Sequence, residues 1–469
     1  MTKPKLTLAN EQPSRSYALG YLVPVVGLAL CIAAFYPGYM SPDSVAQWEQ
    51  GRAWVFTDAH PPLMSALWGI LDRIIPGPFG MLLFHNLMFW GGAALYWRAA
   101  KQRSAMVATG LLLFGFMPQV LGLLSSILKD IGMGASLLLA TALFYQTGKT
   151  KSRVALYLSC PLLFYAYSVR LNSAPAIFPL ALWSAFLACR VIPFLKRRLL
   201  YRSFLTPVIC GILYFALLSV AVTATTKLLA QDKHDYPVQI VLLYDLAAIS
   251  NETGQSYFPA YISEYEGFSM QKVAENYNTE WVADLIYGPK PVLATTRQPE
   301  LISELKAHWW NAVSAHPVIY LKHRWNVFTS LNGFNTEYVY KAFLPVDGYN
   351  PRQFRQERGA LNHSLNAYFF YFSRSILFRG FFWLLICVGL IYFAVRSRLR
   401  GDMGAVLALA TSGFLYTAGY FFYTPSSEFR YIWWTVISAI VALLLFISQL
   451  VSERAAGNLL TETVTEGLP

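Results

Sequence analysis

The chain has 469 residues, of which 55% are hydrophobic and only 13% are charged. An average soluble domain carries about 25% charged residues, so this composition excludes an ordinary soluble protein. A net charge of +12 would suggest nucleic-acid binding in a soluble protein. Here lysine and arginine cluster in short loops beside apolar segments, as the positive-inside rule requires. We therefore expect a polytopic membrane protein that binds a lipid bilayer and no nucleic acid.

Unbroken apolar segments of about twenty residues predict an all-α membrane protein rather than a barrel of short alternating strands. The first segment follows a basic N-terminus and is expected to remain uncleaved, because no small-residue cleavage site comes after it. The five cysteines all fall in apolar segments, which indicates no disulfide framework or metal site. The ten predicted spans are 18–36, 79–97, 105–127, 131–146, 153–168, 174–192, 204–228, 376–395, 403–423 and 431–450.

Basic loops follow the second, fourth, sixth and eighth spans, on the side of the basic N-terminus. This bias places both termini in the cytoplasm. The expected location is a bacterial cytoplasmic (inner) membrane, with the active site on the extracytoplasmic side. The basic loop residues are Lys101, Arg103, Lys149, Lys151, Arg153, Lys196, Arg197, Arg198, Arg202, Arg396, Arg398 and Arg400.

The chain then divides into three predicted regions. An N-terminal transmembrane module, 1–228, contains the first outer loop, 37–78. A small extracytoplasmic α or α+β domain with interfacial helices covers 229–375. Within it, HWWNAVSAHPVIYLKHRWNVF predicts one amphipathic helix at the membrane surface, with tryptophan and tyrosine anchors. C-terminal transmembrane helices and a cytoplasmic tail cover 376–469.

The first outer loop is expected to hold two helices. Ser41 is a good N-cap and Pro42 suits the first helical position, which puts Asp43 in the first turn. The stretch HPPLMSALWGILDRI predicts a second, amphipathic helix.

Ionisable residues are rare in the middle of the apolar segments, with His85 as the main exception. A proton-coupled transporter usually places carboxylates near the midplane, so this pattern argues against one. Polar residues collect instead at the outer ends of the predicted helices, which favours chemistry or binding at the outer leaflet. These residues are Asp43, Asp58, His60, Lys129, Asp130, Arg170, Asn172, Glu428 and Arg430.

Two interpretations of the acidic loop remain open. Asp43 can be a general base that takes the proton of an acceptor hydroxyl, or an acid that stabilises the start of a helix. Asp58 and His60 can supply a second acid and acceptor contacts, or merely form the turn before Pro61 and Pro62. A metal site built from Asp43, Asp58 and His60 has no spacing signature behind it.

The outer-end cations suit a phosphate group. Arg170 and Arg430 carry planar guanidinium groups, which bind phosphate through two parallel hydrogen bonds. Lys129 can bind a phosphate that Asp130 orients, or the two can form a weak surface ion pair. Arg430 can instead pair with Glu428.

Three further cations lie in the outer domain. Lys322, His323 and Arg324 can contact a lipid phosphate, or they can simply extend to the headgroups.

The quoted segments SPDSVAQWEQ, DAHPPL, the KD turn, the VRLN turn and SSEFRY resemble those of the GT-C superfamily of integral-membrane glycosyltransferases. That superfamily includes aminoarabinose transferases of lipid A, protein mannosyltransferases and serotype-converting O-antigen transferases. The resemblance implies a GT-C-like bundle and a polyprenyl-phosphate-linked sugar donor. The implied acceptor is an envelope glycan, glycolipid or protein on the extracytoplasmic face.

By this resemblance Asp43 takes the catalytic role, and direct displacement would invert the anomeric centre. The family often has two adjacent acids in this loop, whereas Ser44 follows Asp43 here. That departure favours a single carboxylate base that requires no cofactor, although a divalent cation stays possible. From position and charge we expect Lys129, Arg170 and Arg430 to hold the donor phosphate. The expected supporting residues are Asp130, Asn172, Glu428, Tyr431 and Arg324.

Other functions share some of these features. A lipid-linked oligosaccharide ligase would use a pyrophosphate carrier with the same sidedness. A lipid or sugar flippase or transporter would be expected to show inverted repeats and midplane charges, and the sequence shows neither. A non-catalytic scaffold of an envelope assembly complex would not depend on Asp43.

Overall fold

The computed structural model describes residues 15–101, 104–197, 205–230, 234–288, 290–334, 348–397 and 400–466. Throughout these ranges the regular structure is helical, and the two β-type contacts are isolated bridges, Tyr39 with Ser126 and Trp281 with Ser426. The predicted all-α class is therefore confirmed for the described residues. Of the predicted basic loop residues, Arg103, Arg198, Arg202 and Arg398 lie outside them.

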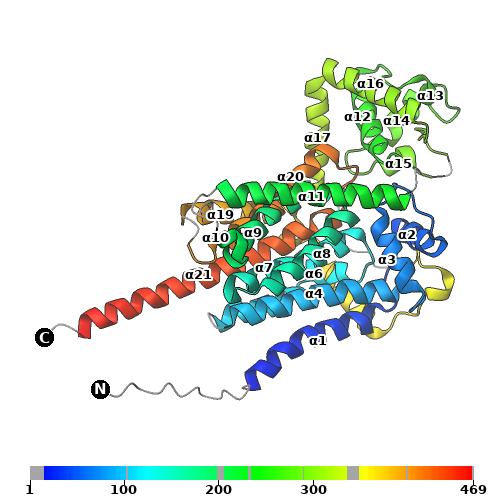
Figure 1. Cartoon of the computed structure of the whole chain (residues 1–469). Helices are drawn as coiled ribbons and strands as arrows, with labels where there is room; N and C mark the ends of the chain where they lie inside the picture. Colours follow the sequence, from blue (N-terminus) through cyan, green and yellow to red (C-terminus); the bar gives the residue numbers. More distant parts are fainter. Residues whose placement is uncertain are drawn as a thin grey trace.

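Most of the helices form one bundle, with two short helices capping one of its ends (Figure 1). The bundle helices are α1 (Arg15–Phe35), α4 (Phe79–Ala100), α5 (Ala105–Leu113), α6 (Pro118–Leu124), α7 (Lys129–Thr150), α8 (Arg153–Val169), α9 (Ala174–Val191), α10 (Pro193–Arg197), α11 (Leu205–Ala230), α18 (Ala360–Phe372), α19 (Gly380–Arg396), α20 (Met403–Tyr423) and α21 (Trp433–Glu466). The capping helices are α2 (Pro42–Ala53) and α3 (Pro62–Asp72). Short 3₁₀ turns are η1 (Phe114–Phe116), η2 (Leu171–Ser173), η4 (Arg352–Phe354), η5 (Ile376–Phe378) and η6 (Phe429–Ile432).

Over the part of the chain that the structure describes, each of the ten predicted spans lies mostly on helical backbone, but they differ in whether the helix is long and apolar enough to cross a bilayer. Within the described residues, five helices are long and apolar enough to cross a membrane, or six if a bent pair counts as one span. The five are 129–150, 171–191, 205–230, 403–423 and 429–454. The structure thus supports a multi-pass membrane protein, while the full number of ten spans stays a prediction.

Two predicted spans differ in detail from the structure. The span predicted at 131–146 begins earlier, because Lys129 and Asp130 form the first turn of α7 rather than a separate turn. The span predicted at 105–127 is bent by 51° between α5–η1 and α6. Pro118 explains the break, since it has no backbone N–H and pushes Met117 into extended backbone.

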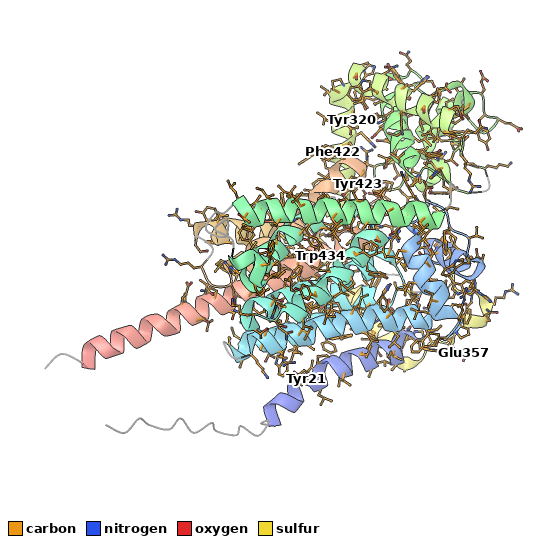
Figure 2. All side chains as sticks on the ribbon, viewed as in Figure 1. Tyr21, Tyr320, Glu357, Phe422, Tyr423 and Trp434 are labelled. Carbon is orange, nitrogen blue, oxygen red and sulfur yellow. The ribbon has the colours of Figure 1, made fainter. Side chains whose placement is uncertain are left out.

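The bundle has a continuous apolar core. α7 packs against α4 and α8, and α20 packs against α9, α19 and α21. Trp90, Trp433 and Trp434 are fully buried in this core, and Figure 2 shows Trp434 in the middle of the bundle. The first residues of α1 and the last residues of α21 lie at one end of the bundle, whereas α2 and α3 lie at the opposite end (Figure 1).

A smaller helical lobe projects from the bundle near the end of α20 (Figure 1). Its helices are α12 (Val238–Thr253), α13 (Ala260–Ser263), α14 (Met270–Asn276), α15 (Ala283–Ile286), α16 (Pro299–Ala315) and α17 (Pro317–Asn332). The lobe has its own apolar core, with members from Leu242 to Val327. In contrast, α18 packs against α1 and α6, so the predicted domain 229–375 divides between the lobe and the bundle.

The prediction of one amphipathic helix across the HWW…NVF stretch was wrong. The structure breaks it into α16 and α17 at His316, whose backbone leaves the helical conformation. Pro317 explains the break, because proline disfavours a helical conformation in the preceding residue.

Candidate active site

Asp43 lies in the first turn of α2, as the sequence predicts. Ser41 caps this helix by accepting a hydrogen bond from the backbone N–H of Ser44, and Pro42 takes the first helical position. The Asp43 side chain is 35% exposed. The acid is therefore held by a well-defined helix start and remains open to solvent or a ligand.

A short backbone pairing fixes the start of α2 beside the start of α7. The N–H of Tyr39 donates to the carbonyl of Ser125 at 2.9 Å, and the N–H of Ile127 donates to the carbonyl of Tyr39 at 2.8 Å. The hydroxyl of Ser44 also donates to the carbonyl of Ile127, at 2.5 Å. Ser44 thus joins the start of α2 to the segment before α7.

His60 and Lys129 lie on one side of Asp43. The ammonium of Lys129 is 2.9 Å from Nδ1 of His60 and 3.9 Å from the carboxylate of Asp43. Because an ammonium can only donate, Nδ1 accepts and the ring proton sits on Nε2. That nitrogen lies 4.0 Å from Asp43, so the histidine turns its proton toward the acid.

Burial and the charge of Lys129 lower the pKa of His60 to about 3. The imidazole is therefore neutral at physiological pH, which agrees with its role as an acceptor for Lys129.

Arg430 lies on another side of Asp43. Its Nη1 is 3.6 Å from Asp43 and 3.9 Å from Asp130, and makes no hydrogen bond within the described chain. Glu428 binds the other edge of the guanidinium, at 2.6 Å from Nε and 3.1 Å from Nη2. The pairing of Arg430 with Glu428 that the sequence left open is thus present, and one nitrogen still faces the acids.

Arg170 is placed differently from the other two cations. Its Nε is 2.8 Å from Asp130, its Nη2 donates to the hydroxyl of Tyr420 at 2.7 Å, and its guanidinium covers the ring of Tyr431. Arg170 is buried and Asp130 fully so. These contacts use the guanidinium of Arg170 inside the protein. Arg170 therefore stabilises the residues around the site and does not face a ligand.

The remaining predicted supporting residues surround Arg170. Asn172 donates to the hydroxyl of Tyr420 at 3.4 Å and accepts at its carbonyl from Tyr423 at 3.0 Å. The rings of Tyr420 and Tyr431 stack with centroids 5.3 Å apart. Tyr420, Tyr423 and Tyr431 form a tyrosine layer. This layer joins the end of α8, the end of α20 and the start of α21.

The assembled cluster is balanced in charge. Lys129, Arg170 and Arg430 face Asp43, Asp130 and Glu428, and His60 is neutral. Burial alone would raise the pKa of Asp43, but Lys129, Arg430, His60 and Arg170 outweigh it and hold that pKa well below its usual value. Asp43 is therefore ionised, as a general base must be. Its affinity for a proton stays low as long as the cations remain close to it.

Among the described residues, no group of three or more His, Cys, Asp and Glu side chains forms a candidate metal site. The acids of the cluster are each paired with arginine or lysine, as the contacts above show. The arrangement suits the binding of an anion better than that of a cation.

Asp58 does not join this cluster. Its carboxylate lies 3.1 Å from Nδ1 of His234 and accepts from the backbone N–H of Asp235 at 2.5 Å. Asp58 therefore links the first outer loop to the segment that enters the lobe, rather than serving beside Asp43 as a second acid.

Arg324 is also elsewhere, fully buried in the lobe. It pairs with Asp245 at 2.7 Å and donates to the carbonyl of Thr424 at 3.1 Å. His323 is buried beside it, 3.3 Å from Asp245. Neither alternative that the sequence left open for His323 and Arg324, contact with a lipid phosphate or extension to the headgroups, agrees with the structure, because both side chains are buried inside the protein.

The lobe is joined to the loop that carries Glu428 and Arg430. The N–H of Ser427 donates to the carbonyl of Glu280 at 2.8 Å, and the N–H of Val282 donates to the carbonyl of Pro425 at 3.1 Å. Together with the bond from Arg324 to Thr424, these contacts fix the loop from the lobe side.

Sequence reasoning did not predict the structural role of Ser44 and did not single out Tyr420. Tyr420 lies within an apolar helix and looks like an ordinary interfacial aromatic residue. One available signal was its spacing, because Tyr416 and Tyr420 are four residues apart and share a helix face, where their hydroxyls lie 3.1 Å apart.

Comparisons with protein-family models, with curated proteins and with solved structures gave no match for this chain. The functional assignment below therefore depends on the site itself.

Proposed function

We propose that this protein is a GT-C-like membrane glycosyltransferase. It transfers a sugar from a polyprenyl-phosphate carrier to an envelope glycan, glycolipid or protein at the extracytoplasmic face. Asp43 is the general base, and no metal is required for the reaction.

The observation that carries this proposal is the position of Asp43 between Lys129 and Arg430, at 3.9 Å and 3.6 Å. A partly exposed carboxylate between two cations at a membrane-helix end offers both a base and an anion site. Lys129 and Nη1 of Arg430, which makes no hydrogen bond among the described residues, suit the phosphate of a lipid-linked donor. Arg170, predicted as a third phosphate ligand, is assigned instead to holding Asp130 and the tyrosine layer.

The proposed reaction has one displacement step. The donor phosphate takes the cations as ligands, which weakens their hold on Asp43 and restores its basicity. The acceptor oxygen attacks the anomeric carbon while Asp43 takes its proton. The bond from that carbon to the phosphate oxygen breaks, and polyprenyl phosphate leaves with the electron pair. Lys129 and Arg430 stabilise the charge that develops on the leaving group.

The arrangement of helices supports the proposed sidedness. Asp43, Lys129, Arg170 and Arg430 belong to four chain segments that are distant in sequence, yet meet at one bundle end. Ten alternating spans with both termini in the cytoplasm bring these four segments to the outer side. The lobe and the first loop would then bound an extracytoplasmic cleft for the acceptor.

The first experiment identifies the sugar and the acceptor, by mass spectrometry of envelope glycans from cells with and without the protein. Transfer is then measured with the purified chain in vesicles that contain the corresponding lipid-linked sugar. Asp43→Asn should lower the transfer rate by about 100- to 10,000-fold, the usual contribution of a general base. Glu49→Gln is the matched control, because Glu49 is an exposed acid on the same helix.

An Asp43→Asn protein that transfers sugar at the wild-type rate would show that Asp43 is not the base. Identical glycans in the two strains would contradict the transferase itself. Activity with a diphosphate-linked donor, and none with the monophosphate, would instead favour a ligase.

A further inference from the structure

Helix α17 has two faces of different character. The side toward the lobe interior carries His323, Arg324 and the buried Val327. The opposite side carries Val318, Leu321 and Trp325, with 76%, 51% and 58% of each residue exposed. Residues spaced by three and four lie on one side of a helix, so these three form a single apolar face.

This apolar face continues into the surface of the spans. α17 packs against α19 and α20, and the ring of Phe328 lies 5.9 Å from that of Phe421. The next residue, Phe422, is 62% exposed and lies one residue before the end of the candidate span 403–423. Figure 2 shows Phe422 at the junction between bundle and lobe, beside Tyr423.

The charged groups on α17 do not oppose lipid contact. Arg324 is neutralised inside the lobe by Asp245, and His323 is buried 3.3 Å from the same carboxylate. Burial lowers the pKa of His323, which favours its neutral form. Lys322 is exposed and pairs with Glu252 at 2.8 Å, and a long lysine side chain can extend to the headgroup level. Tryptophan is enriched at membrane interfaces, which suits Trp325.

We propose that the face of α17 formed by Val318, Leu321 and Trp325 lies in the bilayer interface, so that the lobe rests on lipid beside the end of α20. Contiguous exposed apolar surface is uncommon in water, and here it adjoins α20, which is long and apolar enough to cross a membrane. The contact is apolar and does not involve the lipid phosphates. It limits the movement of the lobe relative to the loop that carries Arg430.

The test uses the full chain with Cys160 and Cys210 replaced by serine, because these are the partly exposed native thiols in the described chain. Val318→Cys is labelled with an environment-sensitive fluorophore and reconstituted into vesicles of phosphatidylethanolamine and phosphatidylglycerol. Its emission should shift to the blue and be quenched by acyl-chain-labelled lipid. Gln271→Cys, on an exposed position of α14, should instead be quenched by aqueous iodide.

Equal iodide quenching at the two positions would overturn the proposal. Protection of Val318→Cys that occurs in native membranes, and not in pure lipid vesicles, would also overturn it and indicate a protein partner. Leu321→Cys repeats the measurement on the same face, in case Val318→Cys fails to fold.

Discussion

Lys129 donates a hydrogen bond to Nδ1 of His60 at 2.9 Å, although Lys129 begins α7 and His60 lies in the segment between α2 and α3. The contact sets the tautomer of the histidine and brings the ammonium within 3.9 Å of Asp43. The same ammonium can therefore hold the acid in the free protein and bind a phosphate in the complex.

Lys129→Gln and Arg430→Gln should each weaken binding of the lipid-linked donor. Each substitution removes a charge-assisted hydrogen bond, worth about 1.5–3 kcal/mol, or roughly 10- to 150-fold in affinity. The donor dissociation constant of the purified protein in vesicles is the measurement. Lys306→Gln, at an exposed lysine of the lobe, is the control and should bind as the wild type does. Unchanged affinity in both variants would remove these residues from the phosphate site.

Arg170→Met should destabilise the fold more than it alters donor recognition. It leaves Asp130, which is fully buried, without its 2.8 Å ion-pair partner. Breaking a buried pair from one side costs about 3–5 kcal/mol. Thermal unfolding of the purified protein measures the loss, and Arg153→Met, at an exposed arginine that begins α8, provides the comparison. A large loss of donor affinity at wild-type stability would assign Arg170 to the phosphate instead.

The stability of the protein should depend on pH through His60. Its pKa falls from 6.5 to about 3 in the folded chain, so the unfolded chain binds more protons between these values. Stability therefore rises with pH through this window, by at most about 1.4 kcal/mol per pH unit for one group. Asp43, with a pKa held below its usual 3.8, adds stability that is lost only at still lower pH.

His60→Asn tests this dependence. Melting temperatures of the wild type and of His60→Asn are measured at constant ionic strength from neutral pH downward. Above pH 4, about the ordinary pKa of Asp43, the melting temperature of the variant should change less with pH than that of the wild type. Parallel curves would mean that His60 does not titrate as the geometry implies.

Gly51→Ala should destabilise the first outer loop. A methyl group on Gly51 would lie 2.3 Å from the carbonyl oxygen of Ser65 and 2.8 Å from the nitrogen of Gly69, because α2 and α3 cross there. Overpacking of this kind costs about 1–3 kcal/mol. Gly389→Ala is the control, since nothing lies within 4 Å of its added methyl group, and it should unfold no earlier than the wild type. Equal melting temperatures for the two variants would contradict the close crossing.

Arg324→Met should loosen the lobe by removing the 2.7 Å ion pair with Asp245 and the bond to Thr424. We expect a loss of about 3–5 kcal/mol and faster proteolysis between lobe and bundle. Lys322→Met, two residues away in the sequence and 58% exposed at its side chain, should change little. Similar proteolysis of both variants would show that Arg324 does not hold the lobe.

The predictions that held depended on local or compositional signals. Composition predicted an all-helical membrane chain, and Ser41 with Pro42 predicted the helix start that holds Asp43, because capping involves neighbouring residues. The break at Pro317 was also available locally, yet the continuing apolar pattern obscured it. The number of spans and the catalytic role of Asp43 remain predictions.

The pairing of charges was decided only by the tertiary structure. Sequence placed Asp43, Lys129, Arg170 and Arg430 at outer helix ends, but it could not tell which cation would face the acid. Packing of α8, α20 and α21 buries Arg170 against Asp130 and leaves Lys129 and Arg430 beside Asp43. The same packing turned Asp58 toward His234 and Arg324 toward Asp245. A charge finds its partner through contacts between distant segments, and no local pattern in the chain records them.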